Sequence, residues 1–191
     1  MPPPTTTPPA TPRPATPPAP PAPAAPPAPS DDPQQQVSAY LYLGGQHRIH
    51  GETQQAIEAF TKALEIDPES YAALNNRAVA YSELADYAAA VADFSEAVRL
   101  QPERTAAYTN RAAAYRQKGD AELAIADYST AIELDPKLAP AYVQRGNLFF
   151  DLGMYTEAIE DYDRALKLNK KLKDAAQKKK VAQQKLKERG R

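Results

Sequence analysis

Small and bulky apolar residues recur along residues 37–172 with a period of 34 residues, and polar residues fill the positions between them. Repeats at 37–70, 71–104, 105–138 and 139–172 align this pattern. In each repeat, position 4 is bulky, position 8 is alanine or glycine, position 11 is aromatic or histidine, positions 20 and 27 are alanine, and position 24 is phenylalanine or tyrosine. Spacings of three and four residues place the first three positions on one face of a helix and the last three on one face of the next. Each repeat is therefore predicted to form two amphipathic helices.

Proline and glycine mark where these helices end. Proline closes the first three repeats, at Pro68, Pro102 and Pro136, and the residue before a proline is disfavoured in the helical region. Glycine lies midway through the first, third and fourth repeats, at Gly51, Gly119 and Gly153, where a chain reversal favours a residue that tolerates positive φ. We expect helices at residues 37–49, 53–66, 71–83, 87–100, 105–117, 121–134, 139–151 and 155–168.

The pattern resembles the tetratricopeptide repeat family, which has bulky, small, aromatic, Ala, Phe and Pro positions at the same spacings. The resemblance covers all of residues 37–172 in four tandem copies, although the fourth copy lacks the closing proline. It implies an all-α fold, a right-handed superhelical solenoid of antiparallel helix pairs with a concave groove. It also implies a protein–protein interaction scaffold or adaptor that binds a partner peptide or helix in this groove, rather than an enzyme.

A helical pattern continues beyond the fourth repeat. Apolar residues lie roughly on one stripe of this segment, at Leu172, Ala175, Ala176, Ala182 and Leu186, with lysines around the rest. A solenoid needs a polar-backed helix over its last open face, so we expect residues 173–191 to form a basic capping helix and tail. A further role of the basic face in binding nucleic acid or an anionic membrane stays open. No aromatic residues are interleaved with these lysines, which disfavours nucleic acid.

The first 36 residues have a different composition from the repeats. They hold 16 of the 20 prolines and no Val, Leu, Ile or aromatic residue, so they cannot form a core. We expect a disordered, extended linker, which serves either as a spacer or as a ligand for a proline-recognising domain. The segment resembles linkers that follow a cleaved leader in exported bacterial proteins. On this resemblance we expect an exported, periplasmic protein whose leader is absent, with a cytoplasmic location as the alternative.

Charge divides the chain in a way that its overall net charge of −1 hides. Residues 37–172 carry 14 Lys or Arg against 20 Asp or Glu, whereas residues 173–191 carry eight against two. The repeats are therefore acidic and the C-terminal segment is basic. No run of 18 apolar residues occurs, so no transmembrane segment is expected.

Two positions of the repeat vary together. Position 7 is arginine and position 23 is aspartate in repeats two to four: Arg77 with Asp93, Arg111 with Asp127, and Arg145 with Asp161. Repeat one has Leu43 and Ala59 at these positions. Because both residue types are present together three times and absent together once, we predict a guanidinium–carboxylate pair at each contact between a first and a second helix. Separately solvated charges are the alternative.

By resemblance, positions 2, 5, 9, 12 and 13 of each first helix line the concave groove, and position 6 lies at its edge. The candidate binding residues at these positions are Leu41, Arg48, Asn75, Asn76, Val79, Thr109, Asn110, Arg116, Val143, Gln144, Asn147 and Phe150. Asn76, Asn110 and Gln144 share one position and form a ladder of amides, which can hydrogen-bond a peptide backbone without reading its sequence. Bridging or capping of neighbouring helices is the alternative role for these amides.

The groove does not match the carboxylate clamp of tetratricopeptide proteins that bind chaperone tails. That clamp needs Lys and Asn in one repeat, Asn in the next, and Lys and Arg in the third. The corresponding residues, counted from repeat one, are Leu41, Gly45, Asn76, Ala106 and Asn110. Only Asn76 fits, and counting from repeat two also leaves a single match. Binding of chaperone tails by this mechanism is not expected.

Chemistry that points to an enzyme or a cofactor is missing from the sequence. No nucleophile–base pair and no Gly-rich phosphate loop are recognisable, so we expect neither catalysis nor a cofactor. His47 and His50 could share a helix face as weak metal ligands, but His47 occupies a core position, which favours packing. The alternatives to a peptide-binding scaffold are a self-assembling module that uses its terminal repeats, with weak homo-oligomers near the exposed Ile49, and, more remotely, an RNA-binding helical repeat.

Overall fold

The computed structural model describes residues 31–189, so the linker expected up to residue 36 lies largely outside the described residues. Within 31–189 the chain forms helices joined by short turns, and no strands. The helices are α1 (Pro33–Ile49), α2 (Thr53–Ile66), α3 (Tyr71–Glu83), α4 (Tyr87–Leu100), α5 (Thr105–Lys118), α6 (Ala121–Leu134), α7 (Ala139–Asp151), α8 (Tyr155–Leu168) and α9 (Lys173–Arg189). The eight helices expected within residues 37–172 are all present.

The first helix begins earlier than expected. α1 starts at Pro33, inside the segment assigned to the linker. The Asp32 carboxylate accepts a hydrogen bond from the backbone N–H of Gln34 at 3.0 Å, and Pro33 lies in the first turn, where its missing N–H is no loss. Residues 33–36 are Pro-Gln-Gln-Gln, without the bulky or aromatic residues of the repeat, so the hydrophobic pattern contained no helix signal there. Helical structure therefore begins at residue 33, four residues before the expected start at residue 37.

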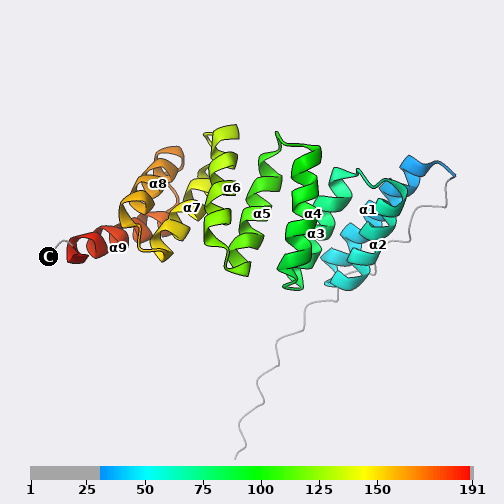
Figure 1. Cartoon of the computed structure of the whole chain (residues 1–191), viewed down its shortest axis with the longest axis horizontal. Helices are drawn as coiled ribbons and strands as arrows, with labels where there is room; N and C mark the ends of the chain where they lie inside the picture. Colours follow the sequence, from blue (N-terminus) through cyan, green and yellow to red (C-terminus); the bar gives the residue numbers. More distant parts are fainter. Residues whose placement is uncertain (1–30, 190–191) are drawn as a thin grey trace, which may run out of the picture.

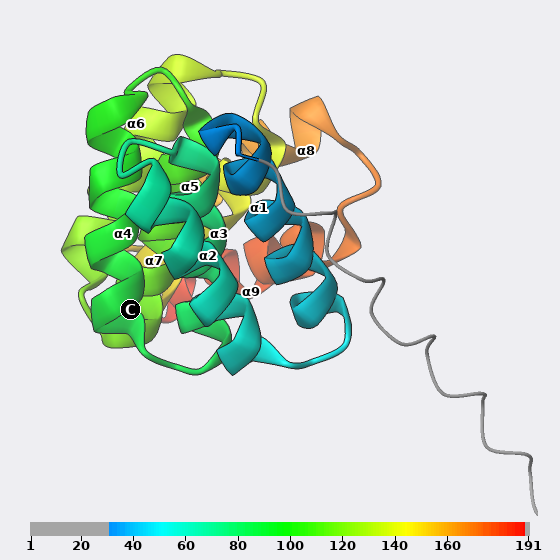
Figure 2. The same cartoon turned by 90° about the vertical axis from the view of Figure 1, so that its right-hand side faces the viewer.

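The helices stack in chain order into an elongated arc, with α1 and α9 at opposite ends (Figure 1). Each first helix from α3 onward packs against the second helix of the preceding repeat, and each pair within a repeat is also in contact. A view from the α1 end shows successive helices lying behind one another (Figure 2). The structure is thus the all-α solenoid that the repeat predicted. No helix among residues 31–189 is long and apolar enough to cross a membrane.

The core consists of the small and aromatic positions of the repeat. The alanines at positions 20 and 27 are fully buried in all four repeats. Phe60, Phe94 and Tyr162, all at position 24, are the largest fully buried side chains. Gly44 lies so close to the Phe60 ring that no room remains for a Cβ. Small residues therefore let the helices approach, and the rings fill the space between them.

Three ion pairs connect first and second helices, as the joint variation of positions 7 and 23 predicted. Arg111 donates two hydrogen bonds to Asp127, both at 2.7 Å, and a third to the Ser95 hydroxyl of the preceding repeat at 3.2 Å. Arg77 and Arg145 make the same contacts with their aspartates and with a Thr or Ser of the preceding repeat. Hydrogen bonding to Asp127 raises the pKa of Arg111 above its usual value. Each arginine thus joins three helices.

Candidate peptide-binding groove

Side chains on consecutive first helices are bonded to one another along one face of the arc. Four contacts form this series: Arg48 to Glu83 at 3.0 Å, Asn110 to Asn75 at 3.1 Å, Arg116 to Gln144 at 3.2 Å and Lys178 to Asn147 at 2.8 Å. They join α1 to α3, α3 to α5, α5 to α7 and α7 to α9. First helices also contact each other directly, α1 with α3 and α3 with α5. The first helices therefore line the inner side of the arc, where the resemblance had placed the groove.

The candidate binding residues mostly have the partial exposure that a binding surface requires. Eleven of the twelve are half-buried, and Asn147 alone is buried. Asn147 is 7% exposed, and its Oδ1 accepts hydrogen bonds from the Tyr162 hydroxyl at 2.9 Å and from Lys178 Nζ at 2.8 Å. Asn147 is therefore buried under α9 and bonded within the fold, and its role in binding stays a prediction.

The amide ladder is partly engaged within the protein itself. The Asn110 amide donates to Asn75 Oδ1, and Gln144 Oε1 accepts from Arg116. The Asn76 side chain forms no hydrogen bond with the residues that the structure describes. Asn110 and Gln144 thus bridge neighbouring helices, whereas Asn76 presents a half-buried amide on α3, and the binding role of the ladder stays a prediction.

An open pocket of about 290 Å³ lies between α3 and α5 on this inner face. Its lining includes Val79 from α3, Tyr87 from the start of α4, and Ala113 and Ala114 from α5, with Ser82, Glu83 and Gln117 completing it. Val79 and Ala113 occupy position 9 in consecutive repeats, and Ser82, Glu83 and Gln117 occupy positions 12 and 13. Of these seven residues, Val79 alone belongs to the candidate residues predicted from the repeat. A small residue such as Ala113 gives no chemical signal of a binding site. Its position in the repeat, which it shares with Val79, could have indicated that it lines the groove.

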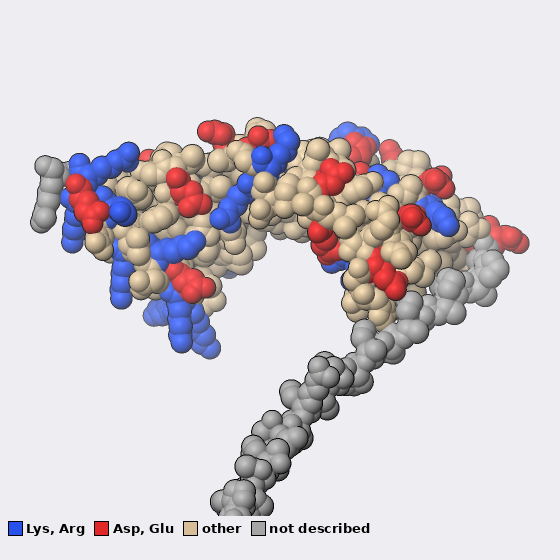
Figure 3. Space-filling view, turned by 90° about the horizontal axis from the view of Figure 1, so that it is seen from below, with Lys and Arg blue, Asp and Glu red and all other residues tan. Residues whose placement is uncertain are grey.

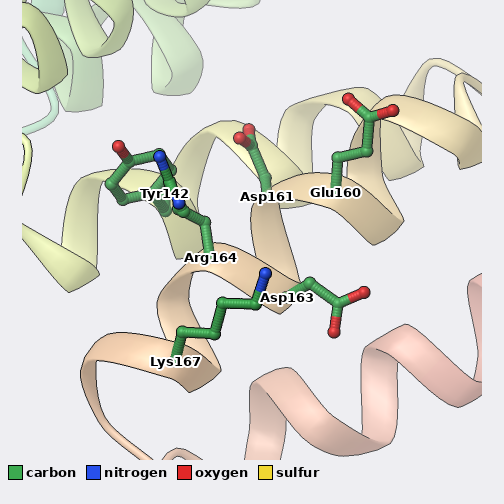
Figure 4. A pocket seen from close by; sticks show the side chains of 6 residues that line it. All are labelled: Tyr142, Glu160, Asp161, Asp163, Arg164 and Lys167. Carbon is green, nitrogen blue, oxygen red and sulfur yellow. The ribbon is translucent and has the colours of Figure 1, made fainter.

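A second open pocket, of about 400 Å³, has a charged lining and lies at α7 and α8. Figure 4 shows Tyr142 from α7 together with Glu160, Asp161, Asp163, Arg164 and Lys167 from α8. Asp161 is bonded to Arg145, and Asp163 is bonded to Lys179. Two of its three carboxylates are thus paired within the fold. Because five of its six lining residues are charged, this pocket suits an apolar side chain less well than the pocket between α3 and α5.

The C-terminal helix α9 continues the repeat register. Lys173 follows Ala139 by 34 residues, so α9 corresponds to the first helix of a fifth repeat. Ala175 and Ala182 are buried against the preceding repeat, which agrees with the expected capping position. Leu186, however, stays 41% exposed although it was included in the packed stripe. It occupies position 14, where Leu84 and Leu152 are also exposed, at 49% and 44%.

The histidine pair has a structural environment. His47 Nδ1 lies 2.5 Å from Glu52 Oε2, so this nitrogen is engaged in the turn between α1 and α2. Among residues 31–189, no group of three or more His, Cys, Asp or Glu side chains is placed to hold a metal ion. The His47–Glu52 contact links the end of α1 to the residue before α2 across the first turn of the array.

Known protein families and solved structures match this chain over most of its repeats. Family models described as "Tetratricopeptide repeat" match residues 37–70, 59–92 and 139–172, and one described as "TPR repeat" matches residues 112–153. No curated protein sequence matches the chain. A crystal structure of MamA protein is similar with a TM-score of 0.75 and 24% identity, covering 80% of this chain and 83% of MamA. At this identity the similarity concerns the fold.

Two further structures show the same fold. A tetratricopeptide repeat protein from Parabacteroides merdae has a TM-score of 0.75 and 23% identity, covering 81% of this chain and 61% of that one. The first TPR of Spaghetti (RPAP3), bound to the HSP90 peptide SRMEEVD, has a TM-score of 0.60 and 30% identity, covering 62% of this chain and 94% of that one. The family matches, the 34-residue period and the stacked helix pairs all agree: the chain belongs to the tetratricopeptide repeat family.

Proposed function

We propose that this protein is an interaction scaffold that holds a segment of a partner protein against the first helices α3, α5 and α7. The observation that carries the proposal is the pocket between α3 and α5, which offers apolar side chains from Val79, Tyr87 and Ala113 on the inner face. The half-buried amide of Asn76 lies on the same helix as Val79. An apolar pocket beside an amide suits a peptide, because it accepts one side chain while the amide bonds the backbone.

The fold of the family supports this function. Tetratricopeptide repeats form scaffolds for protein interaction, and the similar Spaghetti structure holds an HSP90 peptide. The chain lacks most residues of the chaperone clamp, so the partner is a different sequence from a chaperone tail. Catalysis plays no part in the proposal, which needs only a preformed surface.

Selection from a random-peptide display library on the immobilised full chain tests the proposal. Peptides recovered on the wild type are then measured against two variants of the same repeat. Ala113→Trp fills the pocket, whereas Ala126→Trp places the same bulk at an exposed position of α6. We expect the peptides to lose at least ten-fold in affinity for Ala113→Trp and to bind Ala126→Trp like the wild type. Equal binding to both variants, or no recovered peptide, would contradict the proposal.

Self-assembly is a second candidate, because α1 exposes two apolar side chains. Ile49 is 75% exposed and Tyr42 is 46% exposed. Two exposed apolar side chains on one helix favour a contact surface more than a single one does. Sedimentation equilibrium over a hundred-fold range of concentration distinguishes the two functions. A constant monomer mass eliminates self-assembly, whereas a mass that rises with concentration and returns to the monomer value in Ile49→Ser supports it.

A further inference from the structure

The inner face of the arc changes in character from α1 to α9. Position 6 of successive first helices runs through Tyr42, Asn76, Asn110 and Gln144 and reaches Lys178 in α9. Position 13 runs through Ile49, Glu83, Gln117 and Asp151 and reaches Lys185. The face is therefore apolar at α1, rich in amides in the middle, and cationic at α9.

Charges within the four repeats neutralise one another along this face. Arg48 pairs with Glu83 at 3.0 Å, and Arg116 lies 3.7 Å from Asp151. Lys178 differs, because its acceptor, Asn147 Oδ1, is neutral and leaves the lysine charge uncompensated. Lys185 is exposed and has only a 3.5 Å contact with Glu188, which solvent screens.

The remainder of α9 strengthens this positive field. The helix carries seven Lys or Arg against two Asp or Glu. Figure 3 shows an arched molecule with a hollow on its concave side. Lys and Arg side chains gather at the α9 end of the arch. Asp174 lies at the opposite end of α9 from Lys185 and does not neutralise it. Lys179 is the lysine of α9 that is paired with a carboxylate of α8, Asp163. A cationic end beside an otherwise neutralised inner face favours an anionic ligand there.

We propose that the partner segment is a polarised peptide, with an apolar anchor in the pocket between α3 and α5 and acidic residues directed toward Lys178 and Lys185. This inference rests on the proposed function and adds the chemistry and direction of the partner. Packed helices lie about 8–10 Å apart, so the two steps from α5 to α9 span on the order of 20 Å. An extended chain advances about 3.3 Å per residue. The acidic residues therefore follow or precede the anchor by about six positions, on one side only.

A peptide library with a fixed central leucine tests the inference. The six or seven positions on each side are drawn from Glu, Lys, Ala and Ser, and the library is selected on the full chain. We expect glutamate to be enriched about six residues from the leucine, on one side of it. A representative peptide and its copy with lysine at the enriched positions are then synthesised and titrated at low and high salt.

Two neutralising variants assign the charge preference to the inner face. Lys178→Gln removes the charge and keeps a donor for Asn147, so the helix stays docked. Lys180→Gln, at an exposed position of α9 outside the groove positions, is the matched control. We expect Lys178→Gln to weaken the glutamate peptide two- to five-fold and to reduce its salt dependence, while Lys180→Gln leaves both unchanged.

The outcomes separate the inference from the function on which it rests. Binding that depends on Ala113 but shows no glutamate preference, or a preference that Lys178→Gln does not reduce, overturns the polarised peptide and keeps the groove. A library from which nothing binds contradicts the groove itself. Displacement of the glutamate peptide by a single-stranded polyuridine oligonucleotide would assign the lysines to nucleic acid and would also overturn the inference.

Discussion

Lys179 of α9 donates to Asp163 of α8, with 2.5 Å between Nζ and Oδ1, across a separation of 16 residues. The same separation joins Arg145 to the Ser129 hydroxyl in the preceding repeat. The lysine thus occupies the arginine position of a fifth repeat and finds its partner where the earlier repeats have Ser or Thr. This relationship shows that α9 is a helix of the array in register, and it explains why lysines of α9 reach the inner face.

The Arg–Asp pairs are predicted to be coupled more strongly than surface ion pairs. The Arg111 and Asp127 side chains are only 17% and 8% exposed. Arg111→Leu leaves a buried carboxylate without its partner, and we expect the free energy of unfolding to fall by about 3 kcal/mol. The double variant Arg111→Leu/Asp127→Ala recreates the pair of residues in repeat one, and we expect it to lie within about 1 kcal/mol of the wild type. Urea denaturation of the wild type, both single variants and the double variant measures the coupling.

The Lys179–Asp163 pair at the end of the array is the control for this double-mutant cycle. Asp163 is 42% exposed, so Lys179→Ala should lower the free energy of unfolding by less than about 1 kcal/mol. If Arg111→Leu cost no more than Lys179→Ala, burial would not determine the strength of these pairs, and the account of position 7 would be wrong.

The turn of repeat two is predicted to be strained. Ala85 has a φ of +60°, whereas the turns of the other repeats use Gly51, Gly119 and Gly153 at positive φ. An alanine in this conformation costs roughly 1 kcal/mol, so Ala85→Gly should raise the free energy of unfolding by about 0.5–1 kcal/mol. Gly119→Ala is the reverse experiment, since no atom would obstruct its Cβ, and it should destabilise by a similar amount. Changes of the same sign in both variants would refute this explanation. Thermal unfolding is a sufficient measurement.

Alkaline pH is predicted to destabilise the fold through Tyr162. Burial raises the pKa of this fully buried tyrosine to about 12. Because the unfolded side chain ionises near pH 10, the unfolded state loses a proton that the folded state keeps. The stabilisation is complete below pH 10 and is lost as the pH rises toward 12, by about 2–3 kcal/mol.

Comparison with Tyr162→Phe isolates this effect. The variant lacks the hydrogen bond to Asn147 and should be about 1 kcal/mol less stable at pH 8. Its stability should then decline less steeply than that of the wild type between pH 10 and pH 12, as followed by urea unfolding at each pH. Parallel declines in the two proteins would show that Tyr162 is not the group responsible.

The repeat pattern determined the helices because each position has one physical role. Alanines at positions 20 and 27 and the ring at position 24 are core residues wherever they occur, so their spacing predicted α2, α4, α6 and α8 directly. The Arg–Asp pairs were predictable for a similar reason, since the loss of both residues together in repeat one indicates a contact. Arg77, Arg111 and Arg145 each bond a Ser or Thr of the preceding repeat, and no repeat precedes α1 within the described residues.

The binding surface was less predictable, because it depends on contacts that a single repeat does not contain. The position of Asn147 in the repeat predicted a groove residue, but in the structure α9 covers this side chain and supplies Lys178 as a donor. Ala113 carries no chemistry of its own, and it lines a pocket only because Val79 and Tyr87 lie opposite. The fourth repeat also ends at residue 172, so the four-repeat pattern assigned no inner-face position to the lysines of α9.

Site-specific photo-crosslinking tests the central claim, that a partner peptide lies on the inner face, most directly. The chain has no cysteine, so single cysteines at Ala113 and Ala126 can carry a benzophenone label without a background reaction. Both residues belong to repeat three, on α5 and α6, and both are exposed. We predict that a peptide selected on the wild-type chain crosslinks to the label at position 113 and not at position 126. Crosslinking at position 126 alone, or equally at both positions, would contradict binding in the groove.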